Sequence, residues 1–459
     1  MKVFVNRTLN MKKIKAIGFD MDYTLVRYKT ENFEELAHRE TVKKLVEVKG
    51  YPAQVADMPF QFNRVIQGLC IDKMRGNLLQ TNRFGKVKIA YHGTKEIPFK
   101  EMQKLYGNEI IDLNDKTIQS LDTNFSVSNG IIYAQLVDLK SEGHELPDYE
   151  TLAVDIKEAI DICHSDGSIK DKVRDNIDQY IIQDPEVVQL LERFKRFGKK
   201  LWVITNSEFH YAKLLLDYTI NPFLKEHKHW SELFELTTVL ARKPRFFTHD
   251  NDYLVIDPET EMMKNLEGPL VPGIYQGGWA GKLEKDFGVE GDEILYLGDH
   301  IYGDVLSIKK TFNWRTALIL DPLEAEIEAI QNSRPCQKEI DKLMTEKEKL
   351  EHKLNTLDLL KHEEPEKVNK EDINKCYMEI DKINSKISEL LEEFKSHFNP
   401  YWGEMMRAGL EESRIADQVE KYACIYMTKV TDLLEYSPRT YFRPIKRTLA
   451  HEIEDTTSL

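Results

Sequence analysis

The chain has 459 residues, with 64 basic and 78 acidic side chains and a formal net charge of −14 at pH 7. A hydrophobic fraction of 41% and an aromatic fraction of 10% indicate a globular protein, and the length favours two or three domains. The negative charge argues against non-specific binding to nucleic-acid polymers. The longest apolar runs, such as 318–320, are too short to cross a membrane.

Five cysteines are scattered along the sequence without a CxxC pair: Cys70, Cys163, Cys336, Cys376 and Cys424. This spacing argues against a disulfide framework or a structural zinc site and favours a reducing compartment. Residues 1–13 are basic but lack the apolar segment of a signal peptide. We therefore expect a cytoplasmic protein.

In chain order, the first predicted element is a buried strand over 14–19, which ends at Asp20 and Asp22. The carboxyl ends of strands in open α/β sheets are where ligands bind. Two neighbouring carboxylates there repel each other and lose hydration unless a cation or a role in proton transfer compensates. Because aspartates are also common in turns, this pair needs partners elsewhere in the chain to indicate chemistry.

The segment 27–184 follows, and we interpret it as a cap domain inserted above the end of the first strand. It contains a charged helical pattern over 33–49, predicted strands over 65–72 and 86–91, and a mostly helical pattern from about 100 to 161.

From residue 185 onward, strands alternate with helices. The predicted strands are 201–204, 234–240, 293–297 and 316–320, with helices over 185–197 and from about 278. Such alternation predicts parallel βαβ units with right-handed crossovers. Residues 246–275 are expected to form an irregular or β-hairpin excursion.

After residue 335, apolar side chains recur at alternating steps of three and four up to residue 394, with a break at 361–366 (KHEEPE). This pattern predicts an antiparallel helical hairpin that projects from the body as a spacer or an oligomer contact. The predicted domains are a core formed by 1–26 and 185–335, a cap (27–184), a helical hairpin (336–397) and a C-terminal helical segment that packs on the core (398–459).

Three of the later predicted strands also end in polar side chains. The strand over 201–204 is followed by Thr-Asn-Ser at 205–207, which suits hydrogen bonding to phosphate oxygens. The strand over 234–240 is followed by Lys243, which can neutralise developing phosphoryl charge. The strand over 293–297 is followed by Asp299 and Asp304 in GDHIYGD. Alone, these features fit a helix cap, a solvated lysine and a capped loop. Together, each at the end of an apolar strand, they indicate one site.

The chemistry that fits these groups is phosphoryl transfer. Magnesium prefers carboxylates, waters and substrate phosphate, and Asp20 and Asp299 can supply such oxygens, with the backbone carbonyl of Asp22 nearby. A carboxylate nucleophile can form an aspartyl-phosphate. A second carboxylate can protonate the leaving oxygen and later deprotonate water.

The motifs resemble those of the haloacid dehalogenase superfamily of phosphatases, and the longer strings resemble the cytosolic IMP/GMP-preferring purine 5'-nucleotidases. These strings are FDMDYTLVRYK (19–29), RGNLL (75–79), ARKPRFF (241–247), YLGDHIYGD (296–304) and the segment 402–426. The resemblance covers nearly the whole chain. It implies an α/β fold: a Rossmann-like parallel sheet core with a large inserted α+β cap and a C-terminal helical-hairpin extension.

The resemblance also implies roles for the motif residues. Asp20 matches the nucleophile and a magnesium ligand, and Asp22 matches the general acid/base, whose backbone carbonyl also reaches the metal. Asp299 matches the acidic magnesium ligand, and Asp304 matches a second acid that ligates through water or orients the site. The phosphate-binding groups correspond to Thr205, Asn206, Ser207 and Lys243.

In the cap, the resemblance implies substrate contacts. Phe125 matches an aromatic side chain that stacks on the purine, and Asp122 stands where better-known members carry an asparagine. Four further candidates lie in KEAIDICHSDGSIK: Lys157, Asp161, His164 and Lys170. Lys157 replaces an arginine, so the bidentate contact of a guanidinium group would be replaced by the point charge of an ammonium group. For Phe125 and His164, core packing and helix decoration are the structural alternatives.

We therefore expect a magnesium-dependent 5'-nucleotidase that hydrolyses IMP or GMP, with phosphotransfer when a second nucleoside replaces water. The alternatives are a phosphatase for a sugar phosphate or phosphoprotein, and a non-catalytic scaffold whose working part is the hairpin. A purine nucleoside monophosphate is the expected partner, without nucleic-acid polymer or membrane. The chain is expected to form a homo-oligomer, and the sequence leaves dimer and tetramer, IMP and GMP, and effectors open.

Overall fold

The computed structural model describes residues 2–445 and 450–452. The chain forms two compact units, one made of Met1–Pro322 with Met406–Leu459 and the other of Leu323–Met405. The first unit contains the predicted cap and the predicted core up to Pro322, and the second contains the predicted hairpin together with residues 323–335.

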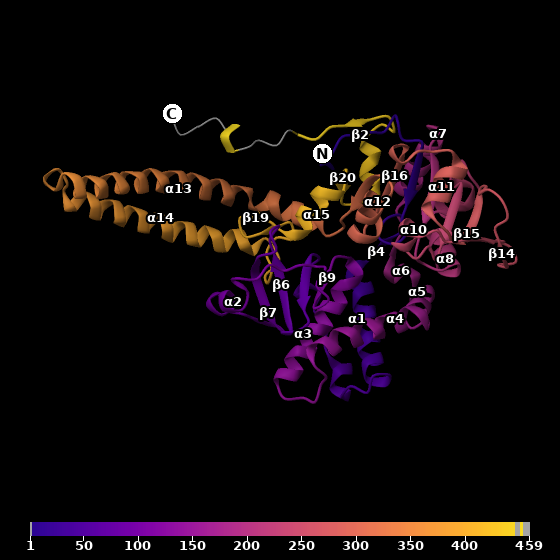
Figure 1. Cartoon of the computed structure of the whole chain (residues 1–459), viewed down its shortest axis with the longest axis horizontal. Helices are drawn as coiled ribbons and strands as arrows, with labels where there is room; N and C mark the ends of the chain where they lie inside the picture. Colours follow the sequence, from indigo (N-terminus) through magenta and orange to yellow (C-terminus); the bar gives the residue numbers. More distant parts are fainter. Residues whose placement is uncertain (1, 446–449, 453–459) are drawn as a thin grey trace. The chain divides into compact units, whose positions relative to one another are not determined.

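A ten-stranded sheet in the order β1-β20-β17-β16-β3-β11-β12-β15-β13-β14 forms the centre of the first unit (Figure 1). The seven strands from β20 to β15 are parallel, whereas β1, β13 and β14 pair antiparallel at the two edges. The strands are β1 (Val3–Val5), β3 (Ala16–Phe19), β11 (Lys200–Ile204), β12 (Leu236–Val239), β13 (Tyr253–Ile256), β14 (Met263–Asn265), β15 (Gly273–Gly277), β16 (Ile294–Gly298), β17 (Arg315–Ile319) and β20 (Ile425–Met427).

The central strands of this sheet are buried on both faces, which explains why they are continuous apolar runs. Side chains alternate between the faces: Ile17 and Phe19 belong to one hydrophobic cluster, and Ala16 belongs to another. The helices of this region are α7 (Pro185–Arg196), α8 (Phe209–Thr219), α9 (Trp230–Leu233), α10 (Arg245–Thr248), α11 (Ala280–Phe287), α12 (Ser307–Thr311) and α15 (Arg414–Tyr422).

The predicted fold class is confirmed, since β3, β11, β12, β16 and β17 are parallel neighbours in the predicted α/β core. The β-hairpin expected within 246–275 is confirmed by the antiparallel pair β13 and β14, although the end of this segment begins β15, which extends the parallel sheet beside β12. One expectation is wrong. The C-terminal segment is not wholly helical, because β20 pairs in parallel with β17. With three residues, β20 is too short for a periodic pattern to show.

The cap combines helices with a five-stranded antiparallel sheet in the order β8-β7-β6-β5-β9. Its strands are β5 (Leu69–Asp72), β6 (Asn77–Thr81), β7 (Val87–His92), β8 (Lys95–Glu96) and β9 (Ile118–Leu121), and its helices are α1 (Thr30–Glu47), α2 (Phe99–Tyr106), α3 (Val127–Ser141), α4 (Tyr149–Ser165), α5 (Lys170–Asp175) and α6 (Ile177–Tyr180). The mostly helical pattern expected over 100–161 is confirmed by α2, α3 and α4 and is interrupted by β9, whose polar Gln119 and Ser120 weaken the apolar signal of a strand.

The chain enters the cap through β4 (Arg27–Tyr28) and leaves it through β10 (Ile181–Ile182), and these two strands pair antiparallel. The cap also contacts the segment after residue 406. Arg83 forms an ion pair with Glu412 at 2.6 Å, and Lys88 forms one with Glu411 at 3.2 Å. The cap is thus attached to the core at its stem and at a second place. Four further short strands form two antiparallel pairs: β2 (Leu9–Asn10) pairs with β21 (Tyr441–Phe442), and β18 (Arg407–Ala408) pairs with β19 (Glu411–Glu412).

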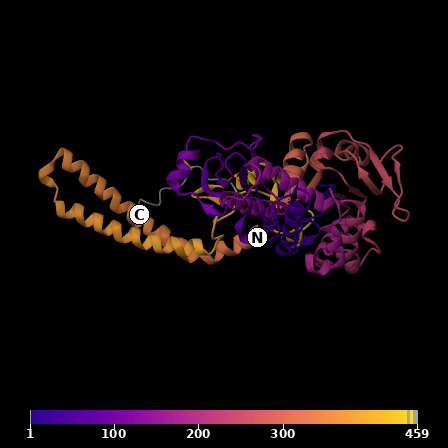
Figure 2. The ribbon, with the colours of Figure 1, turned by 90° about the horizontal axis from the view of Figure 1, so that it is seen from below.

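The second unit is an antiparallel pair of long helices, α13 (Leu323–Glu363) and α14 (Lys370–Ser396), which lie side by side in both ribbon views (Figures 1 and 2). A hairpin was predicted, but its predicted start at 336 is wrong. The three-and-four spacing of apolar side chains begins only after residue 335, whereas α13 begins at Leu323 and continues through Pro335. The buried seam includes Ile340, Leu343, Ile380 and Ile387.

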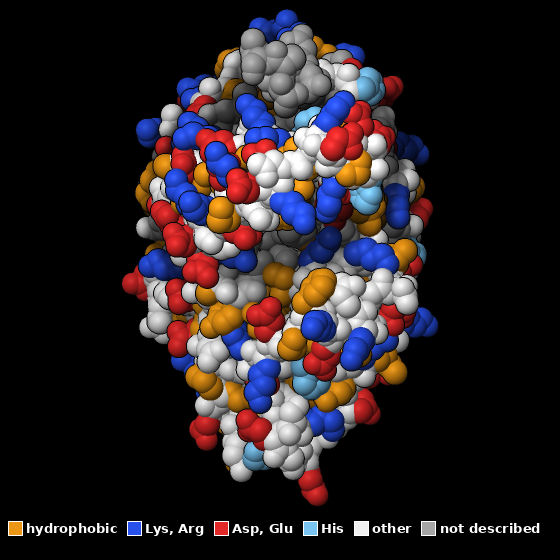
Figure 3. Space-filling model, turned by 90° about the vertical axis from the view of Figure 1, so that its left-hand side faces the viewer, with side chains coloured by type: hydrophobic (Ala, Val, Ile, Leu, Met, Phe, Trp, Pro, Cys, Tyr) orange, Lys and Arg blue, Asp and Glu red, His pale blue; other side chains and the backbone are white. Residues whose placement is uncertain are grey.

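Basic and acidic side chains are intermixed over the face drawn in Figure 3. Among the residues that the structure describes, no helix is long and apolar enough to span a membrane.

Candidate active site

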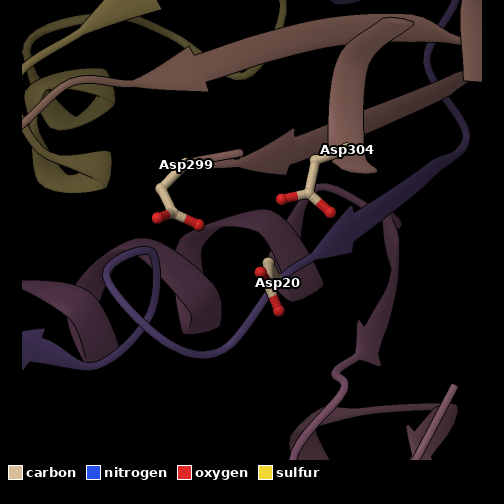
Figure 4. Close-up of side chains that lie close together, drawn as sticks. All are labelled: Asp20, Asp299 and Asp304. Carbon is tan, nitrogen blue, oxygen red and sulfur yellow. The ribbon is translucent and has the colours of Figure 1, made fainter. Parts of the chain in front are cut away.

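Three buried aspartates converge at the carboxyl ends of neighbouring strands (Figure 4). Asp20 directly follows β3, Asp299 directly follows β16, and Asp304 lies in the π-helical turn Ile301–Leu306. One carboxylate oxygen from each lies within 4.8 Å of the others. The parallel register of β3 and β16 therefore brings together groups that are far apart in the sequence.

The turn after β16 has a local reason for its shape. A Cβ atom at Gly298 would collide with the carboxylate of Asp304. The amide of Asp304 donates to the carbonyl of His300 at 2.8 Å, and Nδ1 of His300 accepts from the amides of Tyr302 and Gly303. These contacts fold the turn so that Asp304 points back toward the strand end.

Lys243 is the cation of this cluster. Its Nζ atom lies 2.8 Å from Oδ1 of Asp20 and 2.8 Å from Oδ1 of Asp304, and its side chain is 3% exposed. Burial lowers the pKa of Lys243, but the charges of the two aspartates raise it well above its ordinary value. Lys243 therefore remains protonated and neutralises part of the negative charge.

One lysine does not balance three carboxylates. Within the described residues, no group donates a hydrogen bond to the carboxylate of Asp299 or forms an ion pair with it. Burial raises the pKa of Asp20, although the positive charge of Lys243 lowers it. Burial also raises the pKa of Asp299, and the negative charge of Asp20 raises it further. A divalent cation would favour the ionised forms, and carboxylate oxygens are the ligands that Mg²⁺ prefers. The donor set fits magnesium.

Asp22 is held apart from this cluster by two hydroxyl groups. The hydroxyl of Tyr28 donates to Oδ1 of Asp22 at 2.6 Å, and Oγ of Ser207 donates to Oδ2 at 2.7 Å. Burial, with the charge of Asp20, raises the pKa of Asp22 although both hydrogen bonds lower it. A carboxyl group with a raised pKa suits proton donation near neutral pH.

The residues after β11 are tied to the Lys243 segment. Oδ1 of Asn206 accepts from the amide of Lys243 at 2.6 Å, and Nδ2 of Asn206 donates to its carbonyl at 3.2 Å. Thr205 is fully buried, and its Oγ1 accepts from the amide of Ser207 at 3.0 Å. This network fixes the predicted phosphate-binding groups beside Asp20.

A cavity of about 600 Å³ opens beside these groups. On the core side, its walls include Asp20, Asp22, Asn206, Ser207 and Asp299. On the cap side, four of the predicted substrate contacts line it: Phe125, Asp161, His164 and Lys170. The structure thus brings together the predicted catalytic carboxylates and most of the predicted substrate contacts.

Two predicted substrate contacts do not line the cavity. Lys157 is exposed to solvent. Asp122 is buried, and burial raises its pKa although its interaction with Ser120 lowers it. Contact of these two side chains with a substrate has no support in this structure.

Phe125 is both a wall of the cavity and a packed aromatic. It lies edge-on to Tyr23, with ring centroids 4.7 Å apart, and edge-on to Tyr28 at 6.0 Å. His164 also lies edge-on to Phe125 at 6.4 Å. Burial and the nearby charge of Lys170 lower the pKa of His164 to about 4, so its imidazole is neutral at pH 7.

Sequence reasoning missed several lining residues, most of them apolar or aromatic. They are Tyr28, Phe33, Thr123, Ile169, Tyr211 and His300. Tyr28 and His300 lie inside the motif strings, and Tyr211 lies in the first turn of α8, just after the end of β11. Closeness to a strand end was the available signal for Tyr211.

The chain is similar to known proteins of one family. The model of the 5' nucleotidase family matches residues 3–454. A 5'-nucleotidase domain-containing protein of Dictyostelium discoideum is 22% identical over 459 residues, which is 98% of this chain and 75% of that protein.

Two solved structures are distantly similar over 67% of this chain. A predicted phosphoglycolate phosphatase of Haemophilus somnus has 16% identity, 86% coverage of its own chain and a TM-score of 0.30. A haloacid dehalogenase-like family hydrolase of Xanthomonas campestris has 11% identity, 82% coverage and a TM-score of 0.25.

Proposed function

Because the chain belongs to the 5' nucleotidase family, we propose that it is a magnesium-dependent 5'-nucleotidase for 6-oxopurine nucleoside monophosphates, IMP or GMP. The observation that carries this proposal is the pairing of two differently held carboxylates at one strand end. Asp20 faces Lys243 and two further aspartates, whereas Asp22 is held by two hydroxyl groups beside a cavity with aromatic walls.

The proposed reaction has two steps. In the first, a carboxylate oxygen of Asp20 attacks phosphorus, the bond from phosphorus to O5' breaks, and Asp22 transfers its proton to O5' of the departing nucleoside. In the second, a water oxygen attacks the aspartyl-phosphate while Asp22 takes up its proton, so that inorganic phosphate leaves and Asp20 is regenerated. A nucleoside hydroxyl in place of that water gives phosphotransfer.

The proposed magnesium ligands are the carboxylates of Asp20, Asp299 and Asp304, with the backbone carbonyl of Asp22. When bound, the ion supplies positive charge that stabilises the phosphoryl oxygens. Lys243 supplies a second positive charge next to Asp20 and thereby lowers the cost of placing a phosphate against a carboxylate. Asn206 lines the same wall, and because its amide nitrogen carries two hydrogens, one of them donated to the carbonyl of Lys243, the other can be donated to the phosphate.

The substrate class follows from the cap side of the cavity. Phe125 offers a ring on which a purine can stack, and the neutral imidazole of His164 offers one donor and one acceptor to a base edge. Lys170 adds a positive charge at this wall, where its Nζ forms an ion pair with Glu208 at 3.2 Å. These groups favour a nucleotide over a phosphoprotein.

A phosphate-release screen tests this proposal. We expect hydrolysis of IMP and GMP with Mg²⁺, weaker activity on CMP and ribose 5-phosphate, and none after chelation with EDTA. Activity confined to sugar phosphates or phosphopeptides would refute the purine assignment. The absence of activity on any phosphate monoester would favour the scaffold alternative.

We also propose that the chain acts in the cytoplasm as a homo-oligomer, either a dimer or a tetramer. The paired helices α13 and α14 support this proposal because long antiparallel helices commonly serve as assembly contacts. Light scattering on the eluting peak of a size-exclusion column measures the mass directly. A monomer at all concentrations would refute the assembly.

A further inference from the structure

Tyr28 connects the stem of the cap to Asp22. It lies in β4, the strand through which the chain enters the cap, and its Cα partner in β10, where the chain leaves the cap, is Ile181. From this position its hydroxyl donates to Oδ1 of Asp22 at 2.6 Å. One side chain therefore joins the base of the cap to the proposed acid/base.

The carboxyl group of Asp22 is held from two directions. Ser207, which follows β11 of the core, donates to Oδ2 at 2.7 Å, while Tyr28 donates to Oδ1. Two donors on the two oxygens fix the plane of a carboxyl group, whereas one donor leaves it free to rotate about its last bond. Loss of the Tyr28 hydroxyl would therefore release the orientation of Asp22.

The ring of Tyr28 is itself firmly placed. It stacks on Tyr23 with centroids 4.7 Å apart and an interplanar angle of 26°, and it meets Phe33 edge-on at 4.9 Å. Its hydroxyl lies 3.3 Å from the hydroxyl of Tyr211. Because these contacts depend mainly on the ring, a phenylalanine at this position keeps the packing and removes only the hydroxyl.

We propose that Tyr28 is a positioning residue that orients the carboxyl group of Asp22 toward the leaving oxygen, an inference that rests on the proposed function. Tyr28 exchanges no atoms with the substrate in this role. In the first step, the proton still passes from Asp22 to O5' as the bond from phosphorus to O5' breaks. Tyr28 determines whether that proton lies in line with O5' when the bond breaks.

This role makes a prediction that depends on the leaving group. The alkoxide of a nucleoside is a poor leaving group and needs the proton of Asp22, whereas p-nitrophenolate leaves without protonation. The ratio kcat/KM reports steps only as far as the first irreversible one, which here is transfer of the phosphoryl group to Asp20. Removing the Tyr28 hydroxyl should therefore lower kcat/KM for an alkyl phosphate and spare that for p-nitrophenyl phosphate.

The test compares Tyr28→Phe with the wild-type protein on IMP and on p-nitrophenyl phosphate in the presence of Mg²⁺. The lost hydrogen bond and the resulting misalignment of the acid together predict a fall of about 10- to 100-fold in kcat/KM for IMP. For p-nitrophenyl phosphate we expect a change of less than about threefold.

Tyr51→Phe is the matched control. The hydroxyl of Tyr51 donates to Oδ2 of Asp155 at 3.0 Å in the same cap, and neither residue lines the cavity. This variant loses an equivalent tyrosine–aspartate hydrogen bond outside the cavity. Its kcat/KM for IMP and its kcat/KM for p-nitrophenyl phosphate should therefore both stay at the wild-type value.

Equal losses of Tyr28→Phe on the two substrates, or no loss on IMP, would overturn the role of Tyr28. A wild-type protein that hydrolyses p-nitrophenyl phosphate and ribose 5-phosphate but not IMP would refute the proposed substrate alone. In that case, Tyr28→Phe and the wild type are compared on ribose 5-phosphate in place of IMP, because the leaving group of ribose 5-phosphate is also an alkoxide. A wild-type protein inactive on every phosphate monoester would overturn both proposals.

Discussion

The Nζ atom of Lys243 lies 2.8 Å from Oδ1 of Asp20, although the two residues come from loops after different strands, β12 and β3. A second contact of the same length joins Lys243 to Asp304. Since Asp299 has no such partner among the described residues, the cluster keeps an excess of negative charge. The charge balance of this cluster underlies the first three predictions.

The first prediction concerns Asp20→Asn. The amide cannot attack phosphorus as a carboxylate does, so we expect IMP hydrolysis to fall by about 10³-fold or more. Steady-state phosphate release measures this loss. The side-chain oxygen of asparagine can still accept from the amide of Met21, which donates to Oδ1 of Asp20 at 2.7 Å. Thermal unfolding should therefore show a folded variant, and substantial activity in it would contradict the assigned nucleophile.

Lys243→Met is expected to destabilise the fold as well as stop the reaction. Removing one partner of a buried charge pair costs about 3–5 kcal/mol, because Asp20 and Asp304 are left unpaired. Urea unfolding in EDTA measures this cost, and Mg²⁺ should restore part of it.

Lys15→Met is the control for Lys243→Met. Lys15 pairs with Glu293 at 2.6 Å, but its side chain is 58% exposed, so its loss should change stability far less than the loss of Lys243. Equal losses for the two variants would contradict the special role of the buried lysine.

Asp299→Asn should change stability in opposite directions with and without metal. In EDTA the variant removes a buried carboxylate that lacks a partner, so its melting temperature should rise above that of the wild type. At saturating Mg²⁺ the wild type gains about 3 kcal/mol from binding at 100 times Kd, and the variant should gain much less. An unchanged magnesium effect would remove Asp299 from the proposed ligands.

The residues on the catalytic side of the site could be predicted from the sequence for a physical reason. Strands buried on both faces are continuous apolar runs, and a polar residue that follows such a run lies at the sheet edge. Asp20, Thr205, Lys243 and Asp299 each follow a run of this kind. Their mutual distances then follow from the parallel register, which the alternation of strands and helices implies.

The residues on the cap side of the cavity were harder to predict from the sequence, because they come from three separate elements. Phe125 precedes α3, His164 lies in α4, and Lys170 begins α5, so their meeting depends on how helices pack. Asp122 shows the difficulty: it lies close to Phe125 in sequence but is buried away from the cavity wall. Tyr28 was missed for the same reason, since its contact with Asp22 exists only once the cap stem has formed.

Phe125→Leu tests the substrate side. Stacking of a base on an aromatic ring contributes about 1–3 kcal/mol, so we expect KM for IMP to rise by about tenfold. Ribose 5-phosphate has no base, and its kcat/KM should not change. If both substrates were affected equally, Phe125 would act through its packing on Tyr23 and Tyr28 and not through contact with a purine.

The last prediction concerns Glu34 of α1, a fully buried residue whose Oε2 accepts from the amide of Ser128 in the first turn of α3 at 2.9 Å. Burial raises its pKa from 4.5 to about 7. The folded state therefore binds more protons than the unfolded state between these values. The stabilisation is fully present below about pH 4.5 and is lost as pH rises through about 7.

Glu34→Gln keeps an acceptor for Ser128 but carries no charge, so it should abolish this dependence. From pH 5 to pH 8 we expect the free energy of unfolding of the variant to gain roughly 3 kcal/mol relative to the wild type, measured by urea unfolding at each pH. Glu40→Gln, in the same helix, is the control. Although burial raises the pKa of Glu40, hydrogen bonds from Lys172 and Lys43 lower it overall, so its variant should be destabilised by a constant amount over this range. A constant difference for Glu34→Gln as well would show that Glu34 stays ionised throughout.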